Sequence, residues 1–317
     1  DINNDNFGDI VCHSVTDMQP FINNGSLVFT APPVFFIGQY SSRILVADVN
    51  NDNKVDLVNS SEDQGGVTVQ LGNGNGTFQS YNVYSANGSP NDMLLADFDG
   101  DTRKDALCVH RTKDYISFLK GQTDGSFGPF ELRTALRPKS LAVGLMNGDV
   151  YEDLVVCNSQ SQKVSVMLGN SDGTFQVTIN DSCFTGMQDV VLADFNNDTK
   201  TDAVVIGSTS NILMGDGTGH LIVQGSFNQG FFIGGEYFAV AGKFNSDNNY
   251  DLAIASNNSD SIAVLLGNGD FTFAAPVKYG VGDGPKNIEA YDMNGDTRLD
   301  LLVPNDLSNT VSILLGN

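Results

Sequence analysis

The sequence predicts an all-β protein, a seven-bladed β-propeller built from four-stranded antiparallel blades. Three observations lead to this fold class. A short acidic phrase recurs seven times at intervals of 47 to 49 residues. Apolar runs of strand length flank each phrase, and turn-forming residues separate these runs without a useful length of helical periodicity. A period of this length is typical of a repeat architecture, because one unit is too small to bury a core alone and must pack on its neighbours.

The acidic phrase marks the start of each copy. The copies read DINNDNFGD from Asp1, DVNNDNKVD from Asp48, DFDGDTRKD from Asp97, LMNGDVYED from Leu145, DFNNDTKTD from Asp194, KFNSDNNYD from Lys243 and DMNGDTRLD from Asp292. We expect residues 1–317 to form a single propeller domain. The first copy starts at its acidic loop and the last stops after its third strand, so the first and last blades are expected to be incomplete. About 26 residues would complete them, either further sequence of this chain or a strand from another chain.

One period, residues 91–138, illustrates the four strands. We expect strands at Asp92–Phe98, at Asp105–His110, at Tyr115–Lys120 and after Phe127. Asn-Gly and Asp-Gly dipeptides between the third and fourth runs supply the positive φ angles of tight hairpins. The competing architecture is an open β-solenoid, whose coils usually repeat in fewer residues. Four antiparallel strands per period therefore favour a propeller.

The charge of the chain excludes several classes of partner. The formal net charge is −22, from 38 acidic and 16 basic residues. Nucleic acids and anionic membrane surfaces attract basic patches, so neither is expected to bind. No run of about 18 apolar residues occurs, so no membrane insertion is expected. The acidic residues lie in short clusters between apolar strands, a pattern typical of metal sites.

The acidic phrases are predicted to be calcium sites. Calcium takes six to eight oxygen ligands, and a tight loop can supply them from side chains at positions 1, 3, 5 and 9 and from the backbone carbonyl at position 7. Five copies carry this set. The side-chain ligands would be Asp1, Asn3, Asp5 and Asp9; Asp48, Asn50, Asp52 and Asp56; Asp97, Asp99, Asp101 and Asp105; Asp194, Asn196, Asp198 and Asp202; and Asp292, Asn294, Asp296 and Asp300. The carbonyls would come from Phe7, Lys54, Arg103, Lys200 and Arg298.

Two copies lack the first carboxylate: the Leu145 loop is expected to be empty or weak, and the Lys243 loop is expected to hold no metal. Leu145 replaces it in one, and Lys243 replaces it in the other, where the ammonium could sit near the ion position and neutralise the acids. A single Asp/Asn/Gly phrase would be an ordinary turn, whereas five in register favour metal. The expected role is structural, because each ion would pin a strand connection and offset carboxylate repulsion.

Few other residues suggest chemistry. Cys12, Cys108, Cys157 and Cys183 are expected to be buried free thiols, with Cys157–Cys183 as the least unfavourable disulfide. His13, His110 and His220 show no catalytic signature. Five N-x-[ST] sites at predicted turns are candidates for N-glycosylation: Asn24, Asn59, Asn75, Asn180 and Asn257.

These motifs resemble the FG-GAP repeats, the propeller repeats of integrin α-subunits and of many secreted proteins. The resemblance covers essentially the whole chain. It rests on the D-x-[DN]-x-D-x-x-x-D loop, its flanking apolar strands, and the elements Gly76-Thr77-Phe78, Gly173-Thr174-Phe175 and Gly88-Ser89-Pro90. It implies a calcium-stabilised propeller that works as a binding or adhesion module outside the cytoplasm.

We therefore expect a non-enzymatic extracellular module for adhesion, interaction or structural assembly, with a protein or glycan ligand or copies of itself as partner. Strand sharing between copies would allow self-assembly. The alternative is a propeller lectin, since some fungal lectins are FG-GAP-like. The chain has no Trp for a sugar platform, so Tyr81, Tyr84, Tyr115, Tyr237 and Tyr279 would have to substitute, although core or rim packing explains each of them better.

Overall fold

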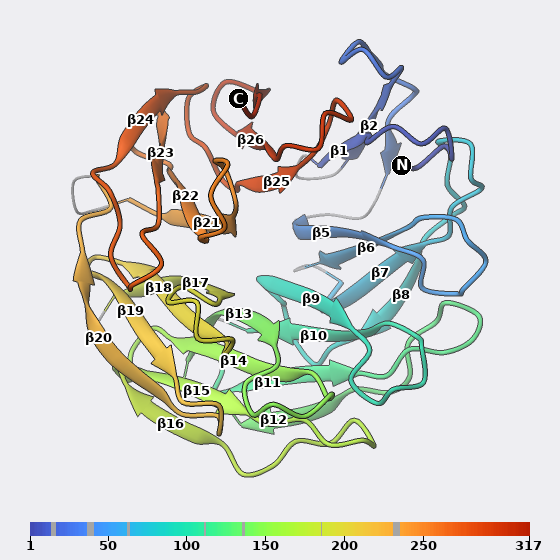
Figure 1. Ribbon diagram of the computed structural model, residues 1–317. Coiled ribbons are helices and arrows are strands. Elements are labelled where there is room, and N and C mark those ends of the chain that lie inside the picture. Colours follow the sequence, from blue (N-terminus) through green and yellow to red (C-terminus); the bar gives the residue numbers. More distant parts are fainter. Residues whose placement is uncertain are drawn as a thin grey trace. The chain divides into compact units, whose positions relative to one another are not determined.

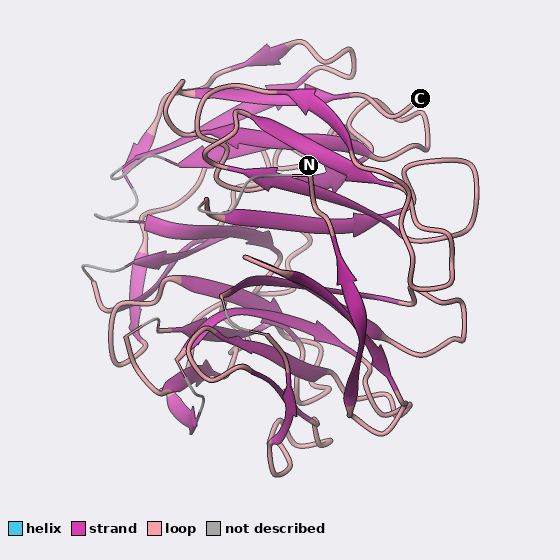
Figure 2. Cartoon of the chain, turned by 90° about the vertical axis from the view of Figure 1, so that its left-hand side faces the viewer, coloured by secondary structure: helices cyan, strands magenta, loops and turns pink. Residues whose placement is uncertain are grey.

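The computed structural model describes residues 1–13, 17–36, 41–61, 64–110, 112–134, 137–184, 186–230 and 235–317. Every regular element in these ranges is a β-strand, and Figure 2 shows strands joined by loops alone. No helix within them is long and apolar enough to cross a bilayer.

The strands form seven antiparallel sheets, which follow one another along the chain from blue to red in Figure 1. The first holds β1 (Ile10–His13), β2 (Asp17–Asn23), β3 (Phe29–Thr30) and β4 (Phe35–Phe36). The next three hold β5 (Ser41–Ala47), β6 (Asp56–Ser61), β7 (Gly66–Gln70) and β8 (Asn82–Ser85); β9 (Asp92–Ala96), β10 (Asp105–Val109), β11 (Tyr115–Leu119) and β12 (Glu131–Thr134); and β13 (Pro138–Gly144), β14 (Asp153–Asn158), β15 (Lys163–Met167) and β16 (Ile179–Ser182). The last three hold β17 (Met187–Ala193), β18 (Asp202–Gly207), β19 (Ser210–Gly215) and β20 (Leu221–Phe227); β21 (Tyr237–Gly242), β22 (Asp251–Ser256), β23 (Ser261–Leu265) and β24 (Val277–Gly280); and β25 (Glu289–Tyr291), β26 (Asp300–Asn305) and β27 (Thr310–Leu314).

These sheets are the blades of a seven-bladed β-propeller, which confirms the predicted fold class. Within each complete blade, consecutive strands pair, as in the order β5-β6-β7-β8. In the first blade both β3 and β4 pair with β2, and the last blade has three strands among the described residues. The strands predicted for residues 91–138 are present and end one or two residues earlier. The fourth begins at Glu131, because Phe127 instead forms an isolated bridge with Gly121.

The chain comprises two compact units. One contains Asp1–Leu141, Asn170–Thr174 and Met293–Gly295, and the other contains Ala142–Gly169, Phe175–Asp292 and Asp296–Asn317. The assignment of residues 1–317 to a single domain stays a prediction.

The core of each unit lies between neighbouring blades. In the first unit, Val58 and Val67 of one blade pack in a cluster with Met93 and Ala106 of the next. In the second unit, Cys157 belongs to a similar cluster with residues of β17 and β18. The second strands β6, β10, β14, β18 and β22 are buried along their whole length. Since both of their faces are covered, strands such as β10 and β18 read in the sequence as largely apolar runs rather than as alternating ones, although β6 also buries Asn59, Ser60 and Ser61.

Candidate metal centres

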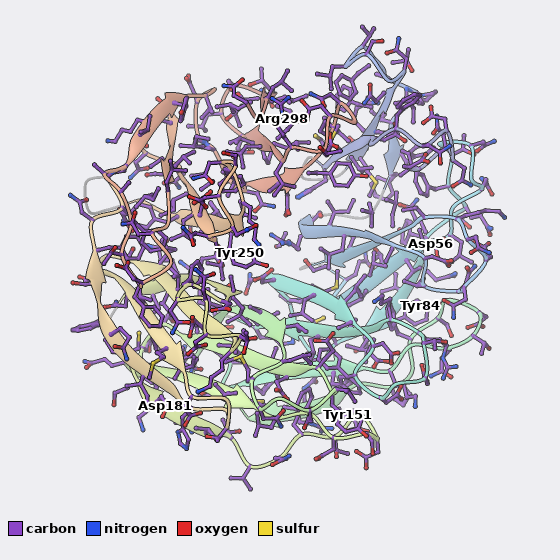
Figure 3. The ribbon with its side chains drawn as sticks, viewed as in Figure 1. Asp56, Tyr84, Tyr151, Asp181, Tyr250 and Arg298 are labelled. Atoms are coloured by element: carbon purple, nitrogen blue, oxygen red, sulfur yellow. The ribbon has the colours of Figure 1, made fainter. Side chains whose placement is uncertain are left out.

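The acidic loops from Asp48 onward each join the first strand of a blade to the second. The ninth residue of each loop begins or immediately precedes the second strand, as Asp56 does at the start of β6 (Figure 3). The loop of residues 1–9 leads in the same way into β1. All residues predicted to bind calcium lie in these turns, so the geometry of the nine positions decides what they can do.

The first-position carboxylate accepts hydrogen bonds from backbone N–H groups of its own loop. Asp48 accepts hydrogen bonds from the N–H groups of Asp52 (3.2 Å) and Asn53 (2.7 Å). Asp1, Asp97, Asp194 and Asp292 accept the same pair from positions 5 and 6 of their own loops. Leu145 and Lys243 have no carboxylate to offer, so their loops lack this anchor.

The sixth position differs between the same two groups of loops. In the five loops with a first-position Asp, its φ is 71° at Asn6, 62° at Asn53, 70° at Thr102, 71° at Thr199 and 72° at Thr297. This left-handed conformation is costly for a β-branched residue such as Thr. Val150 and Asn248 occupy the sixth position of the other two loops, and neither has a positive φ. The N–H bond to the first carboxylate therefore accompanies the strained conformation.

Position 5 is organised in the same way in all seven loops, and position 3 in the six loops before Asp292. The Oδ1 atom at position 3 accepts from the N–H at position 5, and Oδ1 at position 5 accepts from the N–H at position 7, as in the Asp194 loop (2.9 Å for both). The second carboxylate oxygen at position 5 is also engaged in several loops, by the Asn amide at position 3 in the Asp194 loop and by Arg103 in the Asp97 loop. In the Asp97 loop one oxygen each from Asp97, Asp99 and Asp105 lie within 4.8 Å of one another. Hard oxygen donors at this separation fit calcium.

The ninth-position carboxylate has a structural role that the sequence analysis missed. Asp105 is fully buried and accepts two backbone hydrogen bonds, from Phe98 in its own loop (3.1 Å) and from Gly121 after β11 (2.8 Å). Asp56, Asp153, Asp202 and Asp251 do the same with the corresponding residues. This carboxylate, here called the brace, ties the loop to the end of the third strand with or without a first-position Asp. Burial raises the pKa of Asp105 to about 6 and that of Asp202 to about 6.

The glycine that meets the brace is required by close packing. A Cβ at Gly72 would collide with the carbonyl oxygen of Val55, and Gly121, Gly169, Gly215 and Gly267 face the same contact with the eighth residue of their loops. Only Gly lets the N–H reach the Asp. The recurring Asp and Gly, 16 residues apart in most copies, are the sequence signal that could have revealed the brace.

The hairpin turn of the following blade rests on the acidic loop. A Cβ at Gly173 would lie 2.9 Å from Cβ of Asp99, and one at Gly125 would lie 3.2 Å from Cβ of Asn50. The N–H of Gly76 donates to the carbonyl of Ile2 (3.0 Å), the second residue of the first loop. Within each unit the loop thus forms part of the junction between blades.

Lys243 takes a different position from the expected one. Its Nζ lies 5.1 Å from the ring centroid of Tyr250, which is labelled in Figure 3, in a cation–π contact. We expected the Lys243 ammonium to sit among the acids. It instead contacts Tyr250, the eighth residue of its own loop.

The remaining candidates have structural surroundings. All four cysteines are free thiols, and burial raises the pKa of each. His110 is buried, with Nε2 2.9 Å from Oγ of Ser117, and burial lowers its pKa. His220 is exposed, and its hydrogen bond to Asp181 (3.2 Å, labelled in Figure 3) raises its pKa. His13 ends β1.

Two of the five glycosylation candidates are not in turns. Asn59 lies inside β6 with 2% of its surface exposed, and Asn180 lies in β16, where it accepts a hydrogen bond from Ser165 (2.6 Å). The expected turn location was wrong for both, because polar residues also occupy these strands. Asn24, Asn75 and Asn257 do lie outside the strands.

Solved structures show the same fold at low sequence identity. A lectin of Agrocybe aegerita that recognises non-reducing terminal N-acetylglucosamine aligns with a TM-score of 0.63 and 18% identity, over 88% of this chain and 78% of the lectin. A putative 6-phosphogluconolactonase of Bacteroides uniformis aligns with a TM-score of 0.68 and 13% identity, over 93% and 87%. The periplasmic gluconolactonase PpgL of Pseudomonas aeruginosa aligns with 0.64 and 14%, over 98% and 95%. Binding proteins and enzymes share this architecture, so the likeness shows the fold alone.

Sequence comparison identifies the family. No curated protein matches the chain. The profile of the FG-GAP-like repeat matches residues 48–108, 146–205 and 243–303, which together make up more than half of the sequence. Each match begins at or next to the first position of an acidic loop and runs through the brace into the second strand and beyond. The chain therefore belongs to the FG-GAP-like repeat family.

Proposed function

We propose that residues 1–317 form one non-enzymatic, extracellular propeller domain that binds calcium in five acidic loops and serves in adhesion, interaction or structural assembly. The observation that carries the proposal is the shared conformation of the five loops with a first-position Asp. In each, the first-position carboxylate accepts the N–H of a left-handed sixth residue, and in the Asp97 loop oxygens of three carboxylates lie within 4.8 Å of one another. Strain of this kind at several equivalent positions is typical of functional sites.

Calcium would act as a structural ion. Side chains at positions 1, 3, 5 and 9 and the carbonyl at position 7 would hold it, and the ion would supply charge compensation for three or four carboxylates. Since Gly76, Gly125 and Gly173 of the following blades rest on these loops, the order gained at the ion would extend to the junction between blades.

The histidines support a non-enzymatic role. His110 is buried and forms a hydrogen bond with Ser117. The Ser117 hydroxyl donates to the carbonyl of Ala86 (2.6 Å), so both side chains are fixed within the blade. His220, in the turn that follows β19, pairs at the surface with Asp181 of β16. Neither arrangement presents an activated nucleophile beside an oxyanion site.

The edge of β27 offers a surface for assembly. β27 pairs with β26 alone among the described residues, and its residues are exposed or half-buried, whereas β7, the equivalent strand of another blade, is fully buried. An open edge presents unpaired N–H and C=O groups to an incoming strand. A strand from a second copy at this edge would link the subunits, whereas further sequence of the same chain at this edge would complete the blade.

Native mass spectrometry of the chain across a calcium titration tests the proposal. We expect up to five bound ions per chain and a melting temperature that falls when a chelator is added. Binding of no ion, together with an unchanged melting curve in chelator, would refute calcium binding.

Size-exclusion chromatography with light scattering tests assembly. A strand-sharing protein forms oligomers, whereas a strictly monomeric profile contradicts strand sharing.

A carbohydrate-binding role is the second candidate, and one surface feature favours it. A depression of about 300 Å³ is lined by Val83, Tyr84, Ser85 and residues Phe127 to Phe130. Tyr84 packs edge-on against Phe127 (5.8 Å between centroids), and Tyr237 is buried in the core. Binding on a glycan array that is lost in Tyr84→Ala would support a lectin, and absence of binding to any glycan would leave protein partners.

A further inference from the structure

We infer that Lys120 is an internal competitor for calcium in the Asp97 loop and makes it the last of the five loops to fill. This inference rests on the proposed calcium binding. It starts from two departures from the repeat that occur in the same blade. Position 3 of the loop is Asp99 here, whereas the other six copies carry Asn3, Asn50, Asn147, Asn196, Asn245 and Asn294.

The second departure lies at the end of the third strand. Lys120 immediately precedes the glycine whose N–H meets the brace. The residue at this place in the other copies is apolar: Ile22, Leu71, Leu168, Met214, Leu266 and Leu315. One blade therefore exchanges an Asn and an apolar residue for an Asp and a Lys. The added negative and positive charges cancel.

The side chains of these two residues meet. The Lys120 ammonium forms an ion pair with the Asp99 carboxylate and lies 3.5 Å from Oδ2 of Asp101. The Asp99 side chain is only 5% exposed, with Gly173 of the following blade packed against its Cβ. Arg103 pairs with Asp101 from within the loop. Cations of the chain thus contact the carboxylates at both position 3 and position 5.

Calcium needs these same oxygens. To coordinate Asp99 and Asp101, the ion must first displace the Lys120 ammonium, because two cations cannot share the carboxylates without strong repulsion. Lys54 and Arg298 approach the position-5 carboxylates of their own loops (3.4 and 4.0 Å), but only in the Asp97 loop does a cation also pair with a carboxylate at position 3 among the described residues. The loop therefore binds calcium more weakly than the other four. Once the lysine is removed, four carboxylates face the ion where the other loops offer three, and the order of affinities should reverse.

Calcium titration of the full chain by native mass spectrometry, combined with calorimetry, tests this inference. In Lys120→Leu we expect the weakest of the stepwise affinities to rise roughly tenfold or more, as loss of a neighbouring like charge predicts. Lys120→Met serves as a second variant, since Met214 is the natural residue in another copy. Asp97→Ala identifies the step: it should delete the weakest step of the wild type and the tightest step of Lys120→Leu. Leu71→Lys is the converse control and should weaken one step.

The outcomes are distinguishable. If the wild type binds calcium and both Lys120 variants keep its stepwise affinities, this inference is overturned while the proposed function stands. If the weakest step falls further in these variants, Lys120 supports the site and the inference is again overturned. If the folded wild type binds no calcium, both fail. Thermal melting of each variant verifies the fold.

Discussion

Two neighbouring loops of the second unit, Asp194–Asp202 and Lys243–Asp251, show which parts of the repeat serve the fold and which serve an ion. Both keep the brace: Asp202 and Asp251 each accept hydrogen bonds from their own loop and from a glycine at or just after the end of the third strand. They differ at the first position, where Asp194 anchors the left-handed Thr199, whereas Lys243 stacks on Tyr250. The fold thus depends on the ninth position, and the proposed ion depends on the first.

Removing the brace should have the largest effect and should be independent of loop type in the absence of calcium. Asp251→Ala and Asp202→Ala each leave two N–H donors without an acceptor, all buried except the part-buried Phe244 N–H, and one buried donor costs about 1–3 kcal/mol. We expect each variant to lose about 4 kcal/mol of unfolding free energy in chelator, measured by urea denaturation. With calcium present, Asp202→Ala should lose more than Asp251→Ala. Equal losses in both conditions would show that the Asp194 loop binds no ion.

The fifth-position pair Asp198→Ala and Asp247→Ala gives a smaller and more selective effect. Asp198 belongs to a proposed site and Asp247 does not. A ligand at 100 times its Kd contributes about 2.7 kcal/mol per site, so Asp198→Ala should abolish about that share of the calcium-dependent stability. Asp247→Ala should leave the share intact. The measurement is the shift in melting temperature between calcium and chelator, and a matching loss in both variants would remove the distinction between the loops.

The loss of stability at acid pH has a contribution from a histidine outside the loops, which must be removed before the two loops are compared at different pH values. Burial lowers the pKa of His110, and Lys113 acts in the same direction. The unfolded chain then takes up the proton first, so stability is retained above about pH 6.5 and lost as the pH falls below it, by up to about 1.4 kcal/mol per pH unit. His110→Asn should remove this loss, because Asn158 bonds Ser165 (2.8 Å) in the equivalent place of another blade. Unchanged acid sensitivity in the variant would assign it elsewhere.

The smallest expected effect concerns the sixth position. Thr199→Gly relieves a left-handed conformation and should stabilise the calcium-free protein by about 1 kcal/mol or less. Asn248→Gly, at the same position of the Lys243 loop, has no such strain to relieve and should be neutral or destabilising. Urea denaturation in chelator compares the two variants. A gain in Asn248→Gly equal to that in Thr199→Gly would show that the conformational difference does not matter energetically.

The sequence allowed the fold to be predicted because the repeat places the same strand pattern in every copy, and strands such as β10 and β11 lie within one or two residues of their expected ends. The partners of Asp105 could not be read locally, since an Asp suits both a metal site and a buried brace, and the decisive N–H of Gly121 is 16 residues away. The contact of Lys120 with Asp99 was hidden for the same reason. Asn59 was misplaced because its sequon resembles a turn, whereas its amide lies within a buried strand.

The contact between a glycine turn and the loop of the preceding blade, described for Gly125 and Gly173, gives successive blades the same kind of joint. A period with this contact carries one surface that receives a turn and one turn that inserts. A copied period would therefore bring a matching joint at each of its two ends. Blades of this kind can be added or exchanged without designing a new junction, provided that the residue at the third position of the loop keeps a side chain on which glycine can rest.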